Sequence, residues 1–172
     1  ASAGGEGGPE VLAETELAWR HLVGEPVIGI TGTSGKTTTT SLCAAMLEAQ
    51  GLTVFTGGNI GTPLSEYVLE RRAGTRPEAD VLVLELSSFQ LQTCQSLRPR
   101  VGVLLNIAEN HLDYHRDMAE YIEAKMRLFR CQTPADLAVV APSLTGLPER
   151  FHIRSRLVYY DADAGRFPDM PL

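Results

Sequence analysis

Short apolar runs alternate along this chain with longer segments in which apolar residues recur every three or four positions. The short runs are rich in Val, Ile and Leu, and residues 81–84 are continuously apolar, as expected of a strand covered on both faces. The longer segments have the periodicity of helices. The predicted strands are residues 27–31, 53–56, 81–84, 101–105, 137–141 and 157–160, and the predicted helices are residues 37–50, 63–72, 88–97 and 117–130.

Strands that alternate with helices predict an α/β fold, with a mostly parallel sheet and helices on both faces. In such folds ligands gather at the carboxyl ends of the strands, so polar residues that follow a strand are candidates for a site. Residues 1–9 are too rich in glycine to form an element and are interpreted as a linker or a frayed end. Residues 10–24 contain one short amphipathic helix candidate.

Composition narrows the possible functions. The chain has 172 residues and a net charge of −6, which argues against nucleic acid as a partner. No run approaches the roughly 18 apolar residues of a membrane helix, and no signal segment starts the chain, so a cytoplasmic location is expected. The three cysteines are widely separated, which fits neither a disulfide framework nor a zinc site.

Residues 27–38 place a β-branched strand directly before a glycine loop and a helix-forming segment. A phosphate site needs this order, because glycines let backbone N–H groups turn inward and a helix N-terminus adds positive potential. Lys36 supplies a charge for the β- and γ-phosphates, and the Thr37 hydroxyl suits Mg²⁺. The usual spacing G-x-x-x-x-G-K-[ST] is not met, since Ile30 stands five residues before Gly35. We interpret the loop as a shortened variant, with a ligand-free tight connection as the alternative.

A dinucleotide loop is a second alternative, which would make the protein a nicotinamide-dependent reductase. Gly29, Gly32 and Gly35 have the spacing G-x-x-G-x-x-G used by short-chain dehydrogenases and epimerases, and Tyr121-x-x-x-Lys125 resembles their catalytic pair. Against this interpretation, the next predicted strand ends at Thr56 and continues into the loop Gly57-Gly58-Asn59-Ile60-Gly61, without an acidic residue for a ribose 2′-hydroxyl.

Three polar residues follow predicted strands or lie in the loop after one. Glu85 directly follows a four-residue apolar strand, where a carboxylate is costly unless it is paired, and Mg²⁺ on a triphosphate would be a suitable partner. A salt bridge or hydrogen bonds to the next turn are the alternative. Asn106 follows the strand at 101–105 in the same way. Asn59 is flanked by glycines, and it is equally well explained as a left-handed turn residue.

Lys125 lies on the apolar face of the predicted helix at 117–130. A lysine there must extend its amine to water, pair, or lose its proton, because desolvation lowers the pKa of a lysine. A neutral amine can react with CO₂ to form a carbamate, which is an oxygen ligand for a metal. His111 and His115 have i,i+4 spacing, but no third ligand pattern supports zinc, and one histidine near phosphate and metal is the favoured use.

These motifs resemble the ATP-dependent Mur ligases of peptidoglycan synthesis. Residues 29–38 resemble their shortened phosphate loop, residues 106–115 their histidine motif, and Ala124-Lys125 their carbamylated lysine. Residues 57–61 and 84–91 are most similar to the members that add D-glutamate to UDP-N-acetylmuramoyl-L-alanine. The family's usual Asp before the histidine is replaced by Asn110, which leaves the role of that position open.

The resemblance implies that ATP phosphorylates the L-alanyl carboxylate and that the amine of D-glutamate then displaces phosphate to form an amide. It implies catalytic roles for Lys36, His111 and Lys125, one Mg²⁺ on Thr37 and Glu85, and a second on His111 and carbamylated Lys125. The implied substrate contacts are Asn59, Ser87 and Gln90, and the implied nucleotide contacts are Gly32, Thr33, Ser34, Gly35, Lys36, Thr37 and Thr38.

The resemblance also implies how the chain is divided into domains. Residues 1–24 would be a linker and a remnant of an N-terminal domain, and residues 25–172 an incomplete central ATP-binding domain without the C-terminal domain. We therefore expect a monomeric fragment that cannot complete ligation alone. Folylpolyglutamate synthase is a sibling alternative disfavoured by residues 87–90, and a P-loop ATPase or nucleotide-binding module without amide chemistry stays open.

Overall fold

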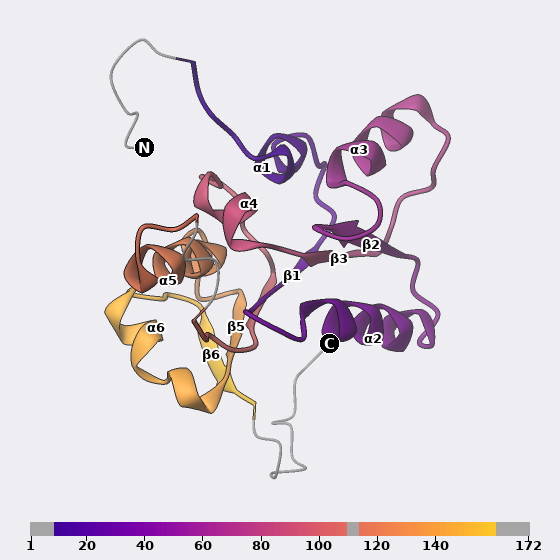
Figure 1. The fold of residues 1–172 in the computed structure, drawn as a ribbon. Helices are drawn as coiled ribbons and strands as arrows, with labels where there is room; N and C mark the ends of the chain where they lie inside the picture. The colour runs from indigo at the N-terminus through magenta and orange to yellow at the C-terminus, as the bar shows by residue number, and fades with distance from the viewer. Residues whose placement is uncertain (1–8, 110–113, 161–172) are drawn as a thin grey trace.

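The computed structural model describes residues 9–109 and 114–160, and in this part six parallel strands form one sheet. Their order across the sheet is β2-β3-β1-β4-β5-β6 (Figure 1). The predicted α/β fold is therefore confirmed. The strands are β1 (Val27–Thr31), β2 (Val54–Gly58), β3 (Val81–Glu85), β4 (Val101–Leu104), β5 (Leu137–Val140) and β6 (Arg156–Tyr159).

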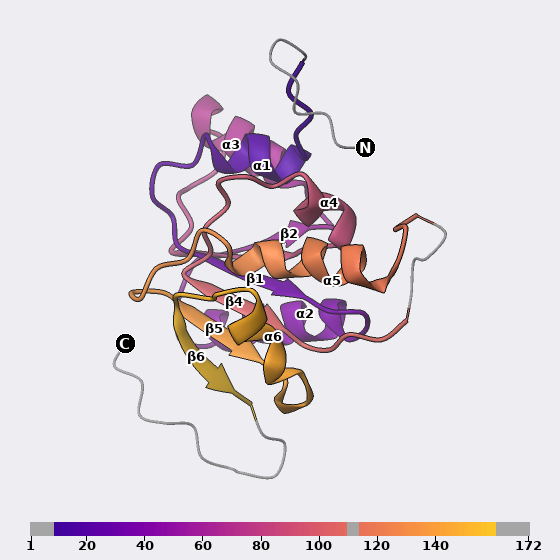
Figure 2. The same cartoon turned by 90° about the vertical axis from the view of Figure 1, so that its left-hand side faces the viewer.

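Helices cover both faces of the sheet, as predicted. One face of β1 and β3 is covered by α2 (Lys36–Glu48), whose Ala44 packs with Ile30 and Val83. The opposite face carries the other helices near β1 and β3, and Figures 1 and 2 show α1, α3 and α4 on the side of the sheet away from α2. The remaining helical segments are α1 (Glu14–Trp19), α3 (Leu64–Ala73), α4 (Ser88–Gln92), α5 (Met118–Met126), α6 (Gly146–Arg150) and the 3₁₀ turns η1 (Arg127–Phe129) and η2 (Pro142–Leu144).

The second strand is longer than the sequence predicted. The predicted strand stops at residue 56, but Gly57 and Gly58 both pair with β3 as the last residues of β2. A Cβ on Gly57 would lie 2.1 Å from the Thr62 carbonyl oxygen, and one on Gly58 would lie 2.4 Å from that of Glu85. Glycine is thus required here by close backbone approach, and it ends the strand beside the end of β3.

Two helices are shorter than predicted. The segment predicted at 88–97 is helical only to Gln92, and Ser96 and Leu97 instead donate backbone N–H groups to the buried carboxylate of Glu16. The segment predicted at 117–130 begins after the cap residue Asp117 and tightens into η1 beyond Met126. In both cases the apolar periodicity continues past the last α-helical turn, so the pattern alone overestimates the length.

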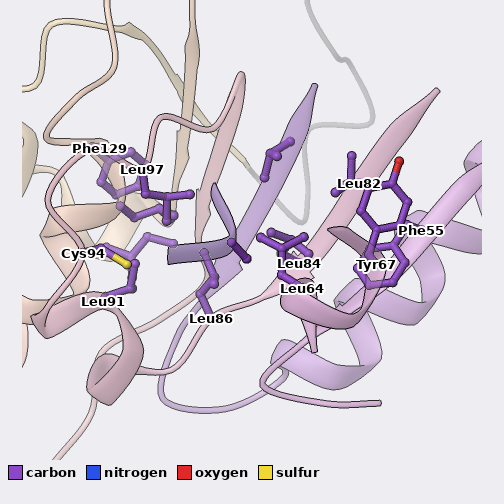
Figure 3. Packing of buried hydrophobic residues seen from close by; sticks show 14 of the residues in the cluster. Phe55, Leu64, Tyr67, Leu82, Leu84, Leu86, Leu91, Cys94, Leu97 and Phe129 are labelled. Carbon is purple, nitrogen blue, oxygen red and sulfur yellow. The ribbon is translucent and has the colours of Figure 1, made fainter. Parts of the chain in front are cut away.

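The main core lies on the face opposite α2 and is shown close up in Figure 3. Because side chains alternate along a strand, Leu82 and Leu84 of β3 point into this core while Val83 points towards α2. Phe55 and Tyr67 pack together at one end, with ring centroids 4.7 Å apart, and Phe129 lies at the other end. This rigid sheet holds the ends of β1, β3 and β4 side by side.

Candidate functional site

The carboxyl ends of β1, β3 and β4 lie next to one another, and the loop at residues 32–35 joins β1 to α2 there. This order differs from the 3-2-1-4-5-6 order of dinucleotide-binding folds, because β3 lies directly beside β1. The strand order therefore argues against the dinucleotide-binding alternative. Gly35 adopts φ +78°, and this left-handed residue directly precedes the first turn of α2.

The glycine loop leaves the N-terminus of α2 open to solvent. The residues Ser34, Gly35, Thr37 and Thr38 are exposed, whereas Gly32 is buried and Thr33 half-buried. The amine of Lys36 turns back on the loop and donates to the carbonyl oxygens of Gly32 and Thr33, each at 3.1 Å. This arrangement presents backbone N–H groups and a lysine charge at one point, which suits an anion.

Asn106 holds this loop to the end of β4. Its side-chain oxygen accepts hydrogen bonds from the backbone N–H groups of Thr33 (3.0 Å) and Ser34 (2.9 Å), and its amide nitrogen donates to the Ser34 carbonyl oxygen (3.1 Å). The sequence singled out Asn106 as a polar residue after a strand and as the first residue of the histidine motif. Its function as a clamp on the loop depends on β1 and β4 being neighbours, which the order of the elements along the chain does not reveal.

Glu85 lies at the end of β3 and is 2% exposed. The hydroxyl of Thr37 donates to Oε2 at 2.7 Å, and the side-chain amide of Asn59 donates to Oε1 at 2.8 Å. No cationic side chain of the described residues forms a salt bridge with this carboxylate. The structure therefore brings Thr37, Asn59 and Glu85 together, with a hydroxyl group and a side-chain amide that both donate to a buried carboxylate.

Lys125 reaches the same loop from α5 and is only 1% exposed. Its amine donates to the Gly32 carbonyl oxygen at 2.9 Å and to Oγ1 of Thr31 at 3.4 Å, and it lies 4.6 Å from the ring centroid of Tyr121. Burial, with the nearby charge of Lys36, lowers the pKa of Lys125 from its usual value near 10.5 to about 7. At neutral pH a substantial share of this amine is therefore unprotonated.

The side chains of Ser87 and Gln90 cap the N-terminus of α4. The hydroxyl of Ser87 accepts from the Gln90 backbone N–H, and the Gln90 side-chain oxygen accepts from the Ser87 backbone N–H. The amide nitrogen of Gln90 donates to the Thr15 hydroxyl in α1 at 3.1 Å. These contacts stabilise the start of the helix beside Glu85, and contact with a substrate stays a prediction for both residues.

His111, like Asn110, lies outside the described residues. His115 is described, and it is 1% exposed, with Nε2 2.9 Å from the Ser88 hydroxyl and its ring stacked on Phe89. Among the described residues, no group of three or more His, Cys, Asp or Glu side chains could hold a metal, and Cys43, Cys94 and Cys131 are free thiols. Every helix of residues 9–109 and 114–160 is too short or too polar to span a lipid bilayer.

Comparison with known proteins identifies relatives for nearly the whole chain. The family model of the Mur ligase middle domain matches residues 30–155. A UDP-N-acetylmuramoylalanine–D-glutamate ligase of Nitratidesulfovibrio vulgaris strain Miyazaki F is 62% identical over 169 residues, which cover 96% of this chain and 38% of that protein. A protein of the same name from Desulfovibrio desulfuricans is 65% identical over 158 residues, which cover 92% of this chain and 35% of that protein. The chain thus spans little more than a third of these relatives.

Solved structures share the fold. MurF ligase from Thermotoga maritima, in complex with ADP, matches with a TM-score of 0.64 and 26% identity over 85% of this chain and 35% of that one. A bifunctional folylpolyglutamate synthase/dihydrofolate synthase matches with a TM-score of 0.59 and 17% identity over 90% of this chain and 49% of that one. The second match shows a common fold only.

Proposed function

Because this chain belongs to the Mur ligase family, we propose that it forms the ATP-handling part of a ligase that adds D-glutamate to UDP-N-acetylmuramoyl-L-alanine. The observation that carries this proposal is the convergence of Lys36, Glu85 and Lys125 on the glycine loop and the first turn of α2, in a chain 62–65% identical to relatives named for that reaction. We also infer a monomer that works in the cytoplasm.

In this reaction the L-alanyl carboxylate takes the γ-phosphoryl group of ATP and becomes an acyl phosphate, with ADP as the leaving group. The amine of D-glutamate then attacks the acyl carbon, phosphate leaves, and the amine loses a proton as the amide forms. Both steps bring negatively charged reactants together, so positioning and charge neutralisation supply most of the catalysis.

The glycine loop has the groups that the phosphates need. Residues Gly32, Thr33, Ser34, Gly35, Lys36, Thr37 and Thr38 would surround the β- and γ-phosphates, with the helix N-terminus of α2 directed at them. Lys36 would leave the carbonyl oxygens of Gly32 and Thr33 and neutralise the transferring group. The ADP held by the MurF ligase of T. maritima supports this use of the fold.

The donor set at Glu85 fits Mg²⁺, which prefers hard oxygen ligands. A buried carboxylate whose partners in the described residues are the neutral groups of Thr37 and Asn59 would gain a cation as a counter-charge. Thr37 and Glu85 would hold the ion, which neutralises phosphate charge when bound. Asn59 would then be free to contact the muramoyl substrate, together with Ser87 and Gln90.

Lys125 suits carbamate formation, because its pKa of about 7 leaves neutral amine available to CO₂. The amine nitrogen would bond to the carbon of CO₂ and release one proton to solvent. The resulting anion would stand near Lys36, which removes the repulsion between the two ammonium groups. With His111 it would hold a second Mg²⁺.

The proposal can be tested in a chimeric ligase, because this chain alone spans only part of the length of its relatives. Residues 9–160 would replace the matching segment of the N. vulgaris ligase, and phosphate release would be measured with both substrates. We expect release that depends on D-glutamate, and its loss in the same chimeric ligase with Lys36→Ala. Phosphate release that is the same with and without D-glutamate would instead support the P-loop ATPase alternative. The isolated chain should bind Mg–ADP in calorimetry but release no ADP in response to D-glutamate.

A further inference from the structure

Tyr121 contacts both the glycine loop and Lys125. It lies one helical turn before Lys125 in α5, and its side chain is fully buried. Its hydroxyl is 3.1 Å from Oγ1 of Thr33, and its ring centroid is 4.6 Å from Nζ of Lys125. One side chain therefore reaches two groups that the proposed reaction needs in a defined relative position.

The Thr33 hydroxyl is the point at which three segments meet. Besides the Tyr121 hydroxyl, it accepts a hydrogen bond from the Ala108 backbone N–H at 2.9 Å and lies 3.2 Å from the Ala108 carbonyl oxygen. The loop, the segment after β4 and α5 are thus joined through one oxygen atom. A phenol buried this deeply is expected to keep a hydrogen bond, so the link is a stable feature of the fold.

The ring of Tyr121 adds a second constraint. In its protonated form, a lysine over the face of an aromatic ring is attracted by the ring's quadrupole. The same amine donates to Gly32, the residue next to Thr33 in the loop. Tyr121 and the loop therefore hold Lys125 from two sides, while the Tyr121 hydroxyl holds the loop itself.

We propose that Tyr121 is a positioning residue, which keeps the phosphate-binding loop and Lys125 in a fixed relation through its hydroxyl bond to Thr33. This inference rests on the proposed function, since it assigns the link to nucleotide binding. A residue that merely filled the core would affect stability alone. Tyr121→Phe separates the two roles, because it keeps the buried ring and removes only the hydroxyl.

The test measures Mg–ADP affinity by calorimetry for the chain and for Tyr121→Phe, Thr33→Val and the double variant. Each single variant should weaken binding about three- to tenfold, the range expected for one hydrogen bond between neutral groups. The double variant should bind no more weakly than Thr33→Val, because both changes remove the same bond. Tyr67→Phe is the matched control, since it removes another buried hydroxyl, one bonded to Glu25 and Ala79, and should leave Mg–ADP affinity unchanged.

Amide hydrogen exchange on the ligand-free chain tests the link without any nucleotide. Exchange at Ala108 should be faster in Tyr121→Phe and unchanged in Tyr67→Phe. The proposal would be overturned if the losses of Mg–ADP affinity in the two single variants multiplied in the double variant. It would also be overturned if Tyr121→Phe and Tyr67→Phe had equal effects. If the chain binds no Mg–ADP, the nucleotide part of the proposed function fails, and unchanged exchange at Ala108 in Tyr121→Phe would then refute the link itself.

Discussion

Lys36 and Lys125 donate to the same oxygen atom, the carbonyl of Gly32, at 3.1 and 2.9 Å. They come from the first turn of α2 and the last turn of α5, so the loop between β1 and α2 brings two lysines from distant parts of the sequence together. Two ammonium groups this close repel each other, and the buried one is the easier to deprotonate. This relationship makes Lys125 the chemically unusual amine of the site.

Lys125→Met should remove a pH dependence of stability. The pKa of Lys125 is about 7 in the folded chain and near 10.5 when the chain unfolds, so the unfolded state binds more protons between these values. The free energy of unfolding should therefore rise with pH from 7 towards 10, by up to about 1.4 kcal/mol per pH unit from this group. Urea unfolding at pH 7, 8 and 9 in CO₂-free buffer measures it.

In Lys125→Met the free energy of unfolding should rise less steeply with pH, because the contribution of the Lys125 amine is gone. The variant should also be more stable than the original chain at pH 7. Equal slopes for the two proteins would show that the amine keeps its proton in the fold. Repeating the series with added bicarbonate should change the free energy of unfolding of the original chain and leave that of the variant unchanged.

Glu85→Gln should weaken binding of Mg–ADP roughly tenfold or more, because it removes the charge from the proposed ligand of the ion. The fold should tolerate the change within about 1 kcal/mol, since a glutamine can still bond both Thr37 and Asn59. Calorimetry and urea unfolding measure the two effects. Glu25→Gln is the control, a buried carboxylate beyond the opposite end of β1. A similar loss of affinity in both variants would contradict a metal role for Glu85.

Gly57→Ala should destabilise the chain by about 3 kcal/mol, because the new methyl group would overlap the Thr62 carbonyl oxygen and the Phe55 ring. Gly146→Ala, in α6, meets no atom within 4 Å and should be neutral or stabilising by up to about 1 kcal/mol. Urea unfolding compares the two. A Gly57→Ala variant as stable as the original chain would mean that the end of β2 is less tightly packed than the structure indicates.

Glu16→Gln should destabilise the chain by about 2 kcal/mol, since the carboxylate accepts from the backbone N–H groups of Ser96 and Leu97 and from Arg20. Burial alone would raise the pKa of Glu16, but the hydrogen bonds, above all from Ser96, hold it below its usual value. Its stabilising contribution is therefore present above about pH 4.5 and is lost as the pH falls through the folded pKa. Urea unfolding should show that the two proteins differ less in their free energy of unfolding at pH 4 than at pH 7.

An exposed carboxylate serves as the control for Glu16. Glu48→Gln, at the end of α2, should change the free energy of unfolding by less than about 0.5 kcal/mol at either pH. If Glu16→Gln behaves in the same way, the contact between α1 and the segment after α4 contributes little to stability.

Much of the site was predictable from local sequence. Lys36 and Thr37 follow a strand and a glycine loop, and Glu85 ends a continuous apolar run, so their place at one edge of the sheet follows from order along the chain. Their chemical roles stay predictions. The apolar stripe of α5 also singled out Lys125, but whether its amine reaches water was decided only by the structure, in which the residue is buried. The clamp by Asn106 and the bond between Tyr121 and Thr33 were not predictable, because each joins segments more than 70 residues apart.

The sequence by itself determined the alternation of strands and helices, the phosphate-type loop and the family, because periodicity and short motifs are properties of neighbouring residues. Only the tertiary structure decided that β3 and β4 flank β1 and that Lys36 and Lys125 share the Gly32 carbonyl. It also placed Gly57 and Gly58 at the end of β2, beyond the strand that the sequence predicted. The physical reason is that strand order, close backbone approach and burial depend on packing between distant segments, which no local pattern records.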